Sequence, residues 1–141
     1  MLVKLISALL LMALCVAIHA AGVSAALRWI PRHPAMYTRP WRWMLLFVCV
    51  AGWMIVLHLL EITAWAVLFA WGGAIPGLLS ALYFSTVTYT TTGYGDIVLP
   101  AEWRLLGGIE ALTGILMCGW STGFFFAVVT RIFTAGKTDR T

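Results

Sequence analysis

The sequence predicts an all-α membrane protein with three transmembrane helices and a shorter segment that enters the membrane and returns. Of its 141 residues, 62% are hydrophobic and only 10% are charged, which is more apolar surface than a soluble domain of this length can bury. A helix that crosses a membrane needs about 20 apolar residues. Three apolar stretches are at least this long: Leu5 to Leu27, Met44 to Ala70 and Leu105 to Phe133. The net charge of +4 is too small and too localised for nucleic-acid binding.

The segment from Trp71 to Trp103, between the second and third spans, has a different composition. It is rich in Gly, Thr and Ser, carries Pro76 and Pro100, and contains a short apolar stretch at Leu78–Tyr89. That stretch is too short to span, which is typical of a re-entrant helix packed inside protein. The C-terminus of such a helix carries partial negative charge at mid-membrane and favours a cation there.

Basic residues predict the orientation. Lys4 and Arg104 lie on one side, and seven basic residues lie on the other: Arg28, Arg32, Arg39 and Arg42 in the first loop, and Arg131, Lys137 and Arg140 in the tail. This excess of basic residues places the first loop and the C-terminus in the cytoplasm and the N-terminus outside the cell. The protein is expected in the inner (plasma) membrane.

The first span could instead be a signal peptide, with Lys4 before an apolar run and small-residue sites near Ala20–Ala21 and Ser24–Ala26. Cleavage would leave the Arg-rich loop outside, against the charge rule. A retained helix is therefore expected.

The loop from Thr91 to Gly95 has the residues of a cation filter. A dehydrated cation needs a ring of oxygens, which backbone carbonyls supply when successive carbonyls face one axis. That backbone requires left-handed dihedrals, which Gly93 and Gly95 accept at little cost. Thr91 can add a hydroxyl oxygen, and Asp96 can attract cations at the outer mouth.

The residues Thr91-Thr92-Gly93-Tyr94-Gly95-Asp96 resemble the potassium-channel signature Thr-Val-Gly-Tyr-Gly-Asp. The preceding Ala81–Ser85 resembles the aromatic pore-helix cuff of that family, and the resemblance covers Met44 to Phe133. It implies a small bacterial-type two-span pore domain at 44–133, an N-terminal span and basic loop at 1–43, and a short tail at 134–141.

The resemblance implies a homotetramer in membrane lipid that conducts K⁺ passively. The carbonyls of Thr91, Thr92, Gly93 and Tyr94 would coordinate K⁺, with Tyr94 turned away from the axis and Gly95 completing the filter. No enzymatic activity, nucleic-acid partner or cofactor other than K⁺ in the filter is expected.

Two positions depart from the family pattern. Thr92 replaces the commoner Val and places a hydroxyl behind the filter. Val87 stands where some members carry a carboxylate, so Asp96 is expected to use another donor, such as Tyr83.

The third span resembles the inner helix of the family. Gly114 lies where that helix bends and is the hinge candidate. Five residues then follow at helical spacing and are expected to line the inner cavity and gate: Ile115, Cys118, Thr122, Phe126 and Thr130. The bulky run Phe124–Phe126 predicts a constriction near the cytoplasm.

Ionisable residues inside the spans are costly and mark functional candidates. Glu61 and Glu110 are expected at similar depth, with His58 one turn from Glu61. We expect one buried polar network, either structural or sensing pH through the histidine. His19 is expected to be a packed polar residue.

Three function classes follow. The first is a passive potassium channel without a voltage sensor, since no span repeats Arg at every third position. The second is a non-selective cation channel or a non-conducting modulatory subunit. The third is a membrane enzyme or metal or haem protein using His19, His58 and Glu61, which is disfavoured because no recognisable ligand spacing exists.

Overall fold

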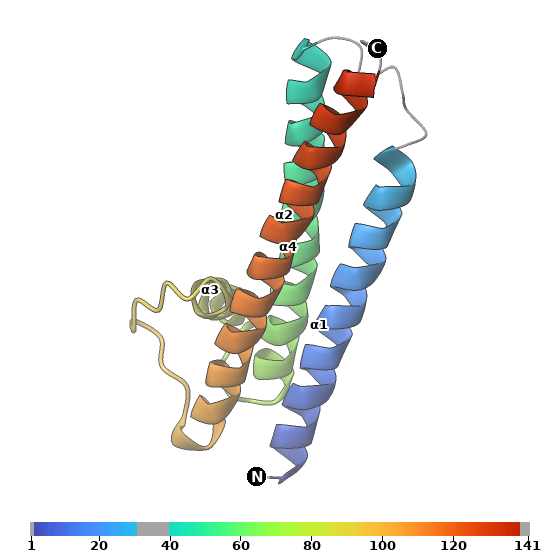
Figure 1. Cartoon of the computed structure of the whole chain (residues 1–141). Coiled ribbons are helices and arrows are strands. Elements are labelled where there is room, and N and C mark those ends of the chain that lie inside the picture. Colours follow the sequence, from blue (N-terminus) through green and yellow to red (C-terminus); the bar gives the residue numbers. More distant parts are fainter. Residues whose placement is uncertain (1, 31–39, 139–141) are drawn as a thin grey trace.

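In the computed structural model, three long helices run side by side, and a short helix lies against their flank (Figure 1). The structure describes residues 2–30 and 40–138, with side chains for residues 2–30 and 41–130. The elements are α1 (Leu2–Trp29), α2 (Pro40–Trp71), α3 (Leu78–Tyr89), the 3-10 turn η3 (Ala101–Trp103) and α4 (Arg104–Thr138). All regular structure in these described ranges is helical, which confirms the predicted fold class.

Three of the helices are long and apolar enough to cross a membrane: Leu2–Trp29, Trp41–Trp71 and Ala101–Thr130. They match the three predicted spans. The first two extend beyond the predicted bounds at both ends, and the third begins four residues before the predicted Leu105. The chain is therefore built as a multi-pass membrane protein. Several residues used for the orientation, among them Arg32, Arg39 and Arg140, lie outside the described residues.

An aromatic core fixes the re-entrant helix α3 against α2 and the start of α4. The ring of Phe69 meets Phe84 edge-on, with centroids 5.4 Å apart, and meets Trp103 at 6.2 Å. The Lys4 ammonium lies 4.1 Å from the centroid of the Trp103 ring, which ties the first turn of α1 to the same end of the bundle. These contacts give α3 a rigid support, as a short helix inside a membrane requires.

At the opposite end, α1, α2 and α4 share a second apolar cluster that includes Leu46, Leu57 and Phe124. Phe124 is buried, and Phe125 stacks on Phe47 at 6.2 Å between centroids. Of the run predicted to form a constriction, only Phe126 remains exposed. The two neighbouring rings are used for packing, because successive helix residues point about 100° apart and cannot share one face.

The first helix is an integrated part of the molecule. It packs against both α2 and α4, and the Trp53 indole donates a hydrogen bond to the Gly22 carbonyl oxygen at 3.0 Å. Leu57 lies so close to Gly22 that a side chain there would overlap it. Close approach of backbones through small residues is the usual way in which membrane helices associate.

Candidate functional site

The loop that follows α3 is fastened to the C-terminal end of that helix. The Thr91 amide donates to the Thr88 carbonyl oxygen at 2.9 Å, and the Gly93 amide donates to Val87 at 3.0 Å. These bonds satisfy carbonyls that the last turn of a helix leaves unpaired. The loop therefore starts from a defined position at the end of α3.

Left-handed dihedrals occur at every second residue of this loop. The φ angles are +59° at Thr91, +56° at Gly93 and +78° at Gly95. The two glycines adopt the dihedrals predicted for them. The positive φ of Thr91 was not predicted, because a β-branched residue rarely adopts it and needs the surrounding structure to stabilise it. Alternation of this kind is what successive carbonyls need in order to face the same way.

The side chains of the loop are exposed in the single chain from Thr90 to Asp96. The hydroxyl of Thr92 lies 3.0 Å from that of Thr90, so the hydroxyl that replaces the commoner Val has a hydrogen-bond partner. Tyr94 is 72% exposed.

Asp96 is held by a residue of α3. The Tyr83 hydroxyl donates a hydrogen bond of 2.6 Å to the Asp96 carboxylate, which confirms Tyr83 as its expected donor. This hydrogen bond lowers the pKa of Asp96 below its usual value, because it favours the charged carboxylate. The carboxylate is accordingly anionic at neutral pH and stands directly after the Thr91–Gly95 loop.

The predicted inner-cavity residues divide into two groups. Ile115, Cys118, Thr122 and Phe126 are exposed along α4 in the single chain. Gly114 is buried against the backbone of Tyr89, where an added Cβ would overlap the carbonyl oxygen. The helix is continuous through Gly114, so this structure gives the glycine a packing role, and a hinge at this position stays a prediction.

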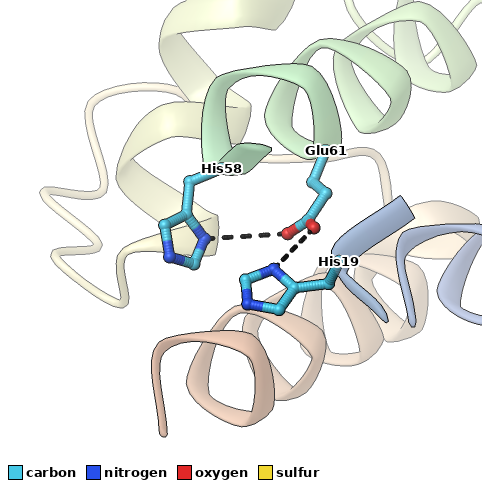
Figure 2. Close-up of side chains that lie close together, drawn as sticks. All are labelled: His19, His58 and Glu61. Carbon is cyan, nitrogen blue, oxygen red and sulfur yellow. Dashed lines mark hydrogen bonds and ion pairs between the residues drawn. The ribbon is translucent and has the colours of Figure 1, made fainter. Parts of the chain in front are cut away.

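Five polar side chains from all four helices form a closed ring of hydrogen bonds, called here the polar ring. Its members are His19 of α1, His58 and Glu61 of α2, Tyr89 of α3 and Ser121 of α4. Figure 2 shows both imidazoles turned toward the Glu61 carboxylate.

The distances close the ring in order. Glu61 Oε1 lies 3.0 Å from His19 Nδ1, and the Tyr89 hydroxyl donates to Glu61 Oε2. His58 Nδ1 lies 3.1 Å from the Tyr89 hydroxyl, and its Nε2 lies 3.0 Å from Ser121 Oγ. Ser121 Oγ completes the ring at 3.1 Å from His19 Nε2.

Counting protons shows what this ring can hold. With Tyr89 donating to Glu61, His58 Nδ1 must donate to Tyr89, Ser121 to His58 Nε2, and His19 Nε2 to Ser121. The last contact, between His19 and Glu61, needs one further proton, which either group can carry. All contacts are then satisfied at zero net charge, which suits a site where Glu61 and His19 are fully buried.

Glu110 is buried but shares no hydrogen bond with the polar ring. Within the described side chains, neither of its carboxylate oxygens has a partner, and the same holds for the Ser85 hydroxyl. The expected network thus brings together His58 and Glu61 but does not include Glu110, whose carboxylate oxygens have no hydrogen-bond partner among the described side chains.

Sequence reasoning grouped His19 with His58 and Glu61 only as a disfavoured ligand set, and it missed Tyr89 and Ser121 as members of the ring. An ionisable residue within a span was the available signal for His19. Tyr89 and Ser121 gave none, because a tyrosine or serine is common on a membrane helix and only the packing of helices shows what it faces.

These features define a class of protein: a multi-pass membrane protein with a re-entrant helix and loop of the kind that lines an ion path. The family model described as Ion channel matches residues 43–131, well over half of the chain, and the chain belongs to this ion channel family. Residues 2–29 of α1 lie outside the match. The chain matches no curated protein and no solved structure at a significant level.

Proposed function

We propose that this protein is one subunit of a potassium-selective channel that conducts K⁺ passively through the carbonyls of Thr91, Thr92, Gly93 and Tyr94. The observation that carries the proposal is the alternating left-handed backbone at Thr91, Gly93 and Gly95, directly after a re-entrant helix. Carbonyl oxygens presented in this way replace the hydration shell of a cation.

A ring of four subunits is part of the proposal. Residues 90–96 are non-helical or at a helix end, and they are exposed in the single chain. Non-helical backbone at membrane depth is tolerated only where protein or a water-filled path covers it. One chain supplies one filter strand, and four strands around an axis supply the carbonyl rings of a potassium filter.

The remaining exposed residues fit this arrangement. Ile115, Cys118, Thr122 and Phe126 would face the cavity below the filter, and the anionic Asp96 would attract cations at the mouth. The charge rule then places the filter mouth and N-terminus outside and the C-terminus in the cytoplasm of the plasma membrane.

Flux into liposomes that hold the purified protein tests this function. We expect uptake that depends on K⁺ and is far smaller with Na⁺. Equal uptake of both ions would favour the alternative of a non-selective cation channel. No uptake of either ion, from a folded and inserted protein, would favour a non-conducting modulatory subunit.

A further inference from the structure

We propose that the polar ring is a binding site for a divalent transition-metal ion of the Zn²⁺ type. The ligands would be the Nδ1 atoms of His19 and His58 and the carboxylate of Glu61. One potential ligand atom from each of these residues lies within 4.8 Å of the others. Two imidazoles and one carboxylate are a ligand set that zinc sites use.

The spacing of the ligand atoms fits such an ion. Bonds of about 2.0–2.2 Å in a tetrahedral site place neighbouring ligand atoms roughly 3.3 Å apart. The carboxylate oxygens of Glu61 lie 3.0 Å from His19 Nδ1 and 3.6 Å from His58 Nδ1. All three ligand atoms lie within 4.8 Å of one another, so the two imidazoles would move closer together to share one ion.

The hydroxyl of Ser121 lies on the side of the two imidazoles away from Glu61, where metal-binding histidines have a hydrogen-bond acceptor. A ligating histidine donates the hydrogen of its other ring nitrogen to an acceptor. The Nε2 atom of His19 lies 3.1 Å from Ser121 Oγ, and the Nε2 atom of His58 lies 3.0 Å from the same oxygen. A hydroxyl oxygen can accept two hydrogen bonds, and Ser121 can donate its own hydrogen to Met54 Sδ at 3.7 Å. Metal binding would leave no polar atom of these groups without a partner.

The electrostatics and ligand types select the kind of ion. Glu61 is fully buried within a span, where a bare carboxylate is costly, and a divalent cation can take the place of the proton that the His19–Glu61 contact holds in the metal-free ring. Imidazole nitrogen suits Zn²⁺, Cu²⁺ and Ni²⁺, whereas K⁺, Mg²⁺ and Ca²⁺ prefer oxygen. The site is therefore distinct from the proposed K⁺ path and does not depend on potassium selectivity.

A metal ion at this site would connect two parts of the chain. The ion would join α1, which lies outside the family match, to α2. The Glu61 ligand is hydrogen-bonded to Tyr89, two residues before the left-handed Thr91. His58 is 19% exposed and is the side from which an ion can enter. A bound metal would fix α1 to α2, whose Glu61 is hydrogen-bonded to the last residue of α3, the helix before the proposed filter.

Zn²⁺ titration of the metal-free protein in detergent, followed by calorimetry, tests the proposal. We expect one Zn²⁺ per chain for the wild type. His19→Gln and His58→Gln should each weaken binding by at least about tenfold, since loss of even an outer partner costs 10–100-fold. His33→Gln is the matched control, because His33 lies outside the described residues and is not a proposed ligand, and it should bind like the wild type.

A second readout uses the wild type alone, so that a variant that fails to fold leaves the test intact. Co²⁺ in place of Zn²⁺ should give visible absorption bands of a four- or five-coordinate site, and added Zn²⁺ should abolish them. Absence of stoichiometric Zn²⁺ binding to the wild type would overturn the proposal, as would unchanged binding in a folded His19→Gln, His58→Gln double variant.

Discussion

At the scale of single residues, the loop proposed as the filter depends on backbone conformations that most residues avoid. Gly93 and Gly95 have positive φ, and nothing lies within 4 Å of a Cβ added at either position. A substitution there meets no steric obstacle in the single chain, so its cost comes from the dihedral angle. Thr91 already has an unfavourable φ of +59°. The hydrogen bond from its amide to the Thr88 carbonyl oxygen is one contact that stabilises this conformation.

We expect Gly93→Ala or Gly95→Ala to abolish selectivity for K⁺ over Na⁺ while the protein still inserts. A left-handed alanine costs roughly 1–2 kcal/mol, in every subunit, so the loop should relax to another backbone. Relative K⁺ and Na⁺ flux measures the effect. Gly52→Ala is the control, because that glycine has ordinary helical φ and open space around it. Unchanged selectivity in both loop variants would count against the filter assignment.

At the scale of elements, the contact between α3 and α4 depends on Gly114. At Gly114, α4 passes so close to the end of α3 that a Cβ added to this glycine would overlap the Tyr89 carbonyl oxygen. Backbone cannot move aside as a flexible side chain does, so the two helices would have to separate.

Gly114→Ala should therefore destabilise the protein by roughly 1–3 kcal/mol, the usual cost of overpacking. Thermal unfolding in detergent measures this. Gly108→Ala on the same helix meets nothing within 4 Å and should leave the midpoint nearly unchanged. If Gly114→Ala is as stable as Gly108→Ala, the close contact between α4 and Tyr89 is not part of the folded protein.

The elements themselves were predictable, and their polar contacts were not. Long apolar runs identify spans because only helices satisfy the backbone in lipid, and the short run at Leu78–Tyr89 identified α3 for the same reason. The polar ring depends on which faces of α1, α2 and α4 meet. His19 and His58 lie far apart in sequence, so no spacing rule could pair them, and Glu110, which was expected at a similar depth, proved to share no hydrogen bond with the ring.

At the scale of the whole molecule, the single chain leaves the filter loop uncovered, and this predicts its assembly. We expect a tetramer in mild detergent, because four loops are needed to close a carbonyl ring. Native mass measurement or chemical cross-linking reports the subunit number. Only monomers or dimers under conditions that preserve the fold would contradict a four-fold filter.

The most direct test of the central claim is the reversal potential of the wild-type current in a planar bilayer, with K⁺ on one side and Na⁺ at equal concentration on the other. The filter proposed for residues 91–95 predicts a reversal potential strongly displaced toward the value for K⁺ alone. A reversal potential at zero, from a protein that carries current, would mean that the loop does not distinguish the two ions, and would contradict this account.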